Sequence, residues 1–240
     1  EAFERTRDSG FPLWRWNALY QQKPSAEEGD IFKLNYFRMW KEEEPPKCQY
    51  VLQTIDMAQT TKTYSDYSVI QTWGIFHTKE QDNKGVEFTV SNLILLDNCR
   101  GKWEYPDLRK LIREKYEAYR PNRVIVEDVA AGISLRQDLR RGGIPVYPYK
   151  PDRDKLARYM SVAPLMEVGR VWTPNRDWAR LLIDECLQIS PTLSHPHDDM
   201  ADAMTMAILF LKDGWYLQHP DDPLFNPPKK KGGPYYWRIK

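Results

Sequence analysis

The fold is decided by three apolar stretches, which read YVLQTID at 50–56, SVIQTWGIF at 68–76 and VEFTVSNLILLD at 86–97. Each is rich in β-branched and aromatic residues and has the length of a single strand. The polar residues 77–85, HTKEQDNKG, separate the second stretch from the third and predict a hairpin turn. The sequence therefore predicts three consecutive strands that meander through one sheet.

Helical and strand patterns alternate downstream of these strands. We expect helices at about 106–119, 134–141, 154–167, 176–186 and 198–211, with short strands at 123–127 and 145–149. Three meandering strands followed by alternating helices and strands predict an α/β fold, in which a mixed sheet carries helices on both faces.

Length and composition favour one domain with irregular ends. The 240 residues suffice for a full core, and a net charge of +1 gives no global attraction to nucleic acid. The three cysteines lack metal-binding spacing, and no apolar run has the ~20 residues of a membrane span. We expect a lead-in or linker segment at 1–49, the domain at 50–214 and a basic, mobile tail at 215–240. Because the sequence lacks an initiator Met, we also expect it to be part of a longer protein.

Acidic residues stand where apolar segments begin or end. Asp56 closes the first strand, Glu127 closes the strand RVIVE, and Asp198, Asp199 and Asp202 open the last long helix. A strand-end Asp is often only a turn former, and Asp198 has the place of a helix N-cap. Glu127, at the tip of a wholly apolar strand, is harder to explain structurally. If the first and fourth strands are neighbours, these carboxylates converge as a two-metal phosphoryl-transfer site requires.

Five segments together resemble the C-terminal nuclease domain of phage large terminase subunits, which belongs to the ribonuclease H-like and RuvC-like nucleases. They read ALYQQKPSAEEGDIFK, IDMAQTTKTYSDYSVI, VIVEDVAAGISLRQDLR, DKLARYMSVAPLMEVGRV and HPHDDMADAMTMAI. The resemblance implies a ribonuclease H-like fold and a metal-dependent endonuclease that cuts double-stranded, concatemeric DNA during packaging. Its metal ligands and catalytic residues would be Asp56, Glu127, Asp199 and Asp202, with Asp199 as the first choice in the last helix and Asp202 as the second. Asp66 would be either an accessory ligand or a turn residue before the second strand.

The resemblance also implies cofactors and partners. Two Mg²⁺ or Mn²⁺ ions would be bound, with Asp56 bridging both, Glu127 serving the ion at the leaving oxygen and Asp199 the ion at the attacking water. The expected partners are double-stranded DNA, a portal protein and a small terminase subunit, in the cytoplasm of the infected host cell. No GxxxxGK[ST] phosphate loop occurs, so we expect the family's ATPase domain to lie outside this chain.

Local clusters of cations are the candidates for DNA contacts. Lys155 and Arg158 lie on one predicted helix, where they either contact phosphates or balance nearby acids. Lys229, Lys230 and Lys231 form a run in the tail that would act as a nonspecific electrostatic arm.

Two other functions fit the same residues. A Holliday junction resolvase or transposase-like nuclease shares the acidic constellation, although the SAEEGDIF lead-in favours a terminase. A noncatalytic module that docks on the portal or the small subunit would keep the acids only as helix caps or evolutionary relics. The presence of acids at both strand ends and at the start of the last helix argues against this function.

Overall fold

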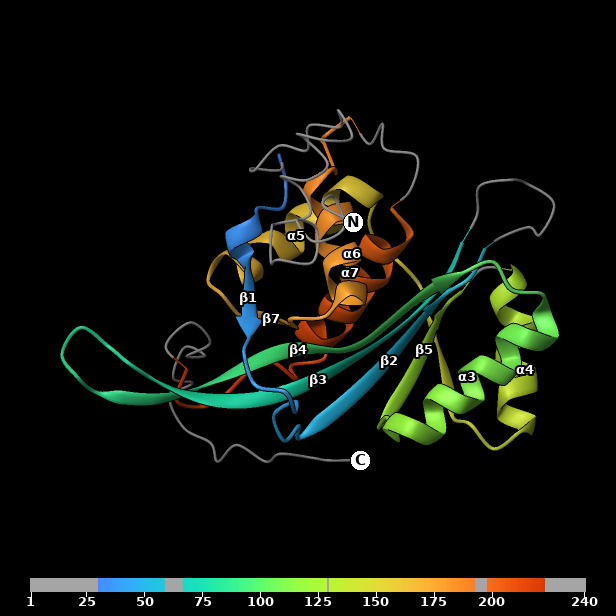
Figure 1. Ribbon diagram of the computed structural model, residues 1–240, viewed down its shortest axis with the longest axis horizontal. Helices are drawn as coiled ribbons and strands as arrows, with labels where there is room; N and C mark the ends of the chain where they lie inside the picture. The colour runs from blue at the N-terminus through green and yellow to red at the C-terminus, as the bar shows by residue number, and fades with distance from the viewer. Residues whose placement is uncertain (1–29, 59–66, 129, 193–197, 223–240) are drawn as a thin grey trace, which may run out of the picture.

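The computed structural model describes residues 30–58, 67–128, 130–192 and 198–222. In this part of the chain, seven strands form one mixed sheet in the order β1-β7-β4-β3-β2-β5-β6 (Figure 1). The predicted meander is confirmed, because β3 (Ser68–Gln81) pairs antiparallel with both β2 (Tyr50–Asp56) and β4 (Glu87–Gly101). The other strands are β1 (Phe37–Trp40), β5 (Arg123–Glu127), β6 (Val146–Tyr149) and β7 (Val171–Pro174).

Helices cover both faces of the sheet, as the sequence predicts (Figure 1). One face packs against α3 (Tyr105–Tyr119) and α4 (Ala130–Arg141). The other packs against α5 (Lys155–Glu167), α6 (Asp177–Leu187) and α7 (Asp199–Asp213). A 3-10 turn, η1 (Leu34–Tyr36), leads into β1. None of the described helices is long and apolar enough to cross a membrane.

The side chains of the central strands alternate between the two cores. Along β5, Val124 and Val126 lie in the core under α3 and α4, whereas Ile125 lies in the core under α5, α6 and α7. The same alternation puts Ile55 in the first core. The next residues after Val126 and Ile55, which are Glu127 and Asp56, therefore face the helices α5, α6 and α7.

The structure corrects the expected hairpin turn. Residues 77–81 continue β3 instead of turning, and the hairpin closes only at the turn where Asp82 Oδ1 accepts from the backbone N–H groups of Lys84 and Val86. The polar residues mislead because a two-stranded projection is exposed on both faces, so its strands lack the apolar alternation of a core strand. The extended β3–β4 hairpin reaches well beyond the rest of the sheet (Figure 1).

The sheet and its core also extend past the limits expected for the domain. Strand β1, from the predicted lead-in, pairs in parallel with β7, and neither strand was predicted. Each has only four residues, too few for a clear periodic pattern. After α7 the chain remains packed, because Leu217 and Asp222 are buried.

Candidate active site

Two of the predicted acids lie side by side at one end of the sheet. Strands β2 and β5 are parallel neighbours in which Ile55 pairs with Val126, so Asp56 and Glu127 occupy the next position of both strands. This confirms that the two strands are adjacent, the condition on which the convergence of the acids depended. Because both side chains face α5, α6 and α7, they meet the acids that these helices carry.

The third group of acids comes from the first turn of α7, which packs on β2 and β3. Asp199 and Asp202 both lie in this turn, three positions apart, so their side chains are on the same face of the helix. Asp198 takes the N-cap position but makes no capping hydrogen bond with its side chain. Its carboxylate instead receives the ammonium group of Lys155, 2.6 Å from Asp198 Oδ2.

Electrostatic coupling shows that these carboxylates share one environment. Asp56 is crowded by protein atoms, although part of the residue stays exposed at the end of β2. The pKa of its carboxyl is raised well above its usual range, first by burial and then by Asp202, Glu127 and Asp199. Burial also raises the pKa of Glu127 and of Asp202, although neighbouring cations oppose the shift at both. An acid held among acids and largely away from water is costly when ionised, unless a cation compensates it.

Two cations of α5 lie among the carboxylates. Lys155 Nζ lies 2.8 Å from Asp202 Oδ2, and Arg158 reaches both Asp202 (3.4 Å) and Glu127 (3.9 Å). Burial alone would lower the pKa of Lys155, but Asp202 and Asp198 raise it. The Tyr159 hydroxyl, on the same helix, donates to Asp202 Oδ1 at 2.9 Å. In the structure, Lys155 and Arg158 thus form ion pairs with the acids. Contact of either residue with DNA stays a prediction.

The donor set suits a hard divalent cation. Among the described residues, no three His, Cys, Asp or Glu side chains are arranged closely enough to hold a metal ion as they stand. However, Asp56, Glu127, Asp199 and Asp202 supply only carboxylate oxygens, which Mg²⁺ and Mn²⁺ prefer as ligands. The pKa of Asp56 is raised by burial and then by the neighbouring acids, and a bound cation would offset both effects. The chemistry of the cluster therefore fits such an ion.

Without metal, the stability of the protein is expected to fall as the pH rises from about 5 to 7. A carboxyl whose pKa is raised in the folded protein keeps its proton after the unfolded chain has released its own, so folding is favoured at the lower pH. Asp56, Glu127 and Asp202 act in this direction, as do Asp184 and Glu185, whose pKa burial raises to about 6 and about 7.

Urea unfolding at several pH values in a chelator measures this dependence. His77, whose pKa burial lowers, contributes an opposing dependence below about pH 6.5. Stability that is flat or that increases between pH 5 and 7 would contradict the shifts in the acids.

The backbone beside Glu127 is fixed by a close approach of α4. A Cβ atom at Gly132 would lie 2.3 Å from the Glu127 carbonyl oxygen and 3.1 Å from the Val126 side chain. Only a glycine lets the first turn of α4 pass so close to the end of β5. The glycine of the VAAG sequence therefore helps to set the position of Glu127.

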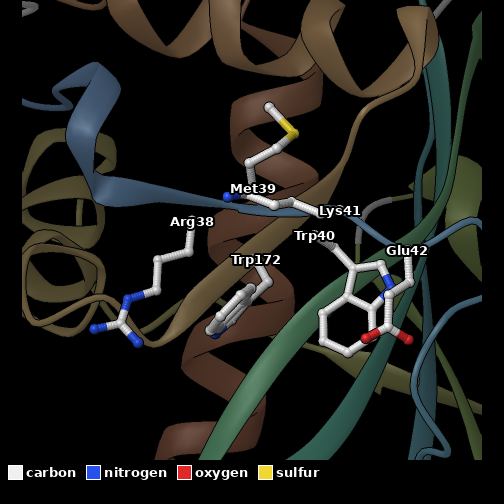
Figure 2. Close-up of a pocket in the computed structure, with 6 residues that line it drawn as sticks. All are labelled: Arg38, Met39, Trp40, Lys41, Glu42 and Trp172. Atoms are coloured by element: carbon white, nitrogen blue, oxygen red, sulfur yellow. The ribbon is translucent and has the colours of Figure 1, made fainter.

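A separate hollow lies at the β1 edge of the sheet, against β1 and Trp172 of β7 (Figure 2). It has a volume of about 470 Å³ and is lined by Arg38, Met39, Trp40, Lys41, Glu42 and Trp172. The Arg38 guanidinium lies 5.4 Å from the ring centroid of Trp172, which packs edge-on against Trp40. Strands β7, β4 and β3 separate β1 from β2 and its Asp56, so this hollow is not part of the acidic site.

Several sequence predictions lie outside the described residues, and other contacts were not predicted. Asp66 and the lysines 229–231 fall in the part that is not described. Sequence reasoning missed Glu185 and Tyr159, which contact α7, and Arg100, which pairs with Glu185. A glutamate inside the otherwise apolar side of α6 was the one available signal for Glu185.

A family model and several solved structures resemble this chain. Residues 99–211 match the family model of the terminase RNase H-like domain. This match covers Glu127, Asp199 and Asp202, and it begins after Asp56. No curated protein sequence matches the chain.

Solved structures share the fold at low sequence identity. The large terminase of a thermophilic bacteriophage superposes with a TM-score of 0.56 and 14% identity, over 76% of this chain and 44% of that one. The P22 large terminase nuclease domain gives 0.53 and 14%, over 77% of this chain and 93% of that one. The large terminase nuclease from thermophilic phage G20c with bound magnesium gives 0.51 and 16%, over 76% and 97%.

The family match and these neighbours together confirm the predicted α/β, ribonuclease H-like architecture. This chain spans less than half the length of the thermophilic phage terminase. The described part of the chain has the fold of large terminase nuclease domains, and residues 99–211 match the terminase RNase H-like domain model.

Proposed function

We propose that this chain is the nuclease domain of a DNA-packaging terminase and hydrolyses phosphodiester bonds of double-stranded DNA. The observation that carries the proposal is the convergence of Asp56, Glu127 and the first turn of α7 at one end of the sheet. The family match and the fold agree with it. The G20c nuclease structure with bound magnesium supports a divalent ion as the cofactor.

The acids would hold two Mg²⁺ or Mn²⁺ ions, with Asp56, Glu127 and Asp199 as ligands and Asp202 close by. When bound, the ions supply Lewis acidity, which makes water a stronger nucleophile and stabilises the leaving oxygen. The protein itself contributes a cluster of carboxylates that Lys155 and Arg158 partly neutralise. No protein nucleophile is required in such a mechanism.

A cleavage assay on two substrates tests the proposal against its nearest rival. A terminase nuclease should nick a supercoiled plasmid and a linear duplex in Mg²⁺ or Mn²⁺ with little sequence preference. A Holliday junction resolvase should instead cut a four-way junction and leave the matching linear duplex intact. Absence of cleavage on both, in a folded protein that binds no metal, would favour a docking module.

We also propose that cations of the C-terminal tail bind DNA electrostatically. Deleting residues 229–240 removes five cations, which are Lys229, Lys230, Lys231, Arg238 and Lys240. Each phosphate contact adds about 0.9 to the slope of log affinity against log salt concentration, so losing two or three contacts should flatten the slope measurably. Salt-dependent DNA binding of the full and shortened chains measures the change.

Two matched variants identify the source of any change. Replacing the three lysines by glutamine should flatten the salt dependence, whereas replacing Tyr235, Tyr236 and Trp237 by serine should leave it unchanged. A shortened chain with the original slope and a lower melting temperature would mean that the tail is structural.

The portal protein, the small terminase subunit and an ATPase domain remain proposed partners, and the host cytoplasm remains the proposed location.

A further inference from the structure

The first turn of α7 is capped by a side chain from another helix. The side chain of the N-cap residue Asp198 makes no capping hydrogen bond, because its carboxylate forms an ion pair with Lys155. Instead Glu185, near the end of α6, accepts a hydrogen bond from the backbone N–H of Ala201 at 2.9 Å. Ala201 lies between Asp199 and Asp202, so the cap acts on the turn that carries both acids.

An arginine ties this cap to the sheet. Arg100 Nη1 lies 2.8 Å from Glu185 Oε2, and the Glu185 side chain is only 4% exposed. Arg100 pairs in register with Val69, and Val69 pairs with Asp56. The cap is therefore anchored in the row of the sheet that carries Asp56.

A second anchor holds the same turn from below. Gln71, on β3, is fully buried, and its amide nitrogen donates to the Met200 carbonyl oxygen at 2.9 Å. The same nitrogen donates to Asn98 Oδ1 at 3.0 Å, while Gln71 Oε1 accepts from Trp73 Nε1 at 3.0 Å. A buried amide with this many partners has one allowed orientation, which fixes Met200 and its neighbours against the sheet.

We propose that Glu185 is a positioning residue that fixes the acids of α7, Asp199 above all, in the geometry for binding divalent metal. The inference rests on the proposed function, since it assumes that Asp199 is a metal ligand. Glu185 acts through its hydrogen bond to Ala201, and Arg100 holds Glu185 in place. Residues that orient metal ligands typically change metal affinity about 10- to 100-fold when they are lost.

Two substitutions separate the reach of the side chain from its charge. Glu185→Asp keeps the negative charge for Arg100 but withdraws the oxygen from Ala201 by one methylene. Glu185→Gln removes the charge and turns an amide nitrogen towards Arg100, but it keeps one oxygen at the reach of Ala201. We expect Glu185→Asp to weaken Mn²⁺ binding about 10-fold or more and Glu185→Gln to weaken it less, as measured by isothermal titration calorimetry.

Thermal melting of each variant checks the fold, and Gln71→Met tests the second anchor with a side chain of similar size. Gln71→Met should also weaken Mn²⁺ binding, and it keeps the proposal testable should Glu185→Asp fail to fold. Lys115→Met is the control, because it breaks another ion pair of β4, with Asp97 at 2.6 Å. It should lower the melting temperature and leave Mn²⁺ affinity unchanged.

The outcomes distinguish this inference from the proposed function. An original protein that binds no Mn²⁺ would overturn the proposed function itself. If that protein binds Mn²⁺ but folded Glu185→Asp and Gln71→Met bind it equally well, the positioning role is wrong. A Glu185→Gln variant that binds more weakly than Glu185→Asp would show that charge, and not the hydrogen bond, is what matters.

Discussion

Replacing Asp56 by asparagine is expected to lower DNA nicking by about three orders of magnitude or more, which corresponds to several kcal/mol of lost transition-state stabilisation. The carboxylate lies in a crowded site at the end of β2 and is coupled to all three other proposed ligands. An amide of the same shape keeps the packing but removes the anionic oxygen that a metal requires. Plasmid nicking in Mg²⁺, at equal concentrations of folded protein, measures the loss.

Stability should change in the opposite direction. In a chelator at neutral pH, Asp56→Asn is expected to raise the free energy of unfolding, because it removes one acid from a crowded cluster of acids. Asp128→Asn is the matched control, since Asp128 follows Glu127 directly but pairs with Arg136. The control should retain nicking. An Asp56→Asn variant that nicks normally would move the primary ligand elsewhere.

Removing divalent ions is expected to abolish cleavage altogether while the protein stays folded. The acids lie at the end of the sheet, whereas stability comes from two apolar cores on its faces. Lys155 and Arg158 also neutralise part of the acidic cluster when metal is absent. Nicking assays and circular dichroism in a chelator, followed by readdition of Mg²⁺ or Mn²⁺, test both parts of the expectation.

Calcium provides the control for binding without turnover. Ca²⁺ accepts the same oxygen ligands, but its larger and looser coordination shell fits a tight two-ion transition state poorly. It should raise the melting temperature, as a ligand of the folded state does, without restoring nicking. Undiminished cleavage in the chelator would exclude the metal-dependent mechanism.

The central strands could be predicted from sequence because the core imposes a pattern on them. Strands β2 and β5 each end in a charged residue after mainly apolar residues, so the positions of Asp56 and Glu127 at the strand ends could be predicted. The acids of α7 could be predicted for a related reason, because they stand at the start of a long apolar helix. Convergence of Asp56 and Glu127 depended on β2 and β5 being neighbours, which the structure confirms.

The surroundings of the acids could not be predicted, because they depend on contacts between distant parts of the chain. Glu185 lies 16 residues from Ala201, and Arg100 lies 85 residues from Glu185. The place of Lys155 and Arg158 among the acids depends on how α5 packs against α7. Sequence separation hides such contacts, whereas a strand pattern is local and visible.

Gly132 shows that a site can require a residue because it has no side chain. A full mutational scan of nuclease activity should rank this position with the acids, although glycine can neither bind metal nor donate a proton from its side chain. Every substitution adds at least one carbon where the Glu127 carbonyl already lies 2.3 Å from the ideal Cβ position. Searches for distant relatives should therefore give the glycine that follows the VIVE strand as much weight as the glutamate that ends it.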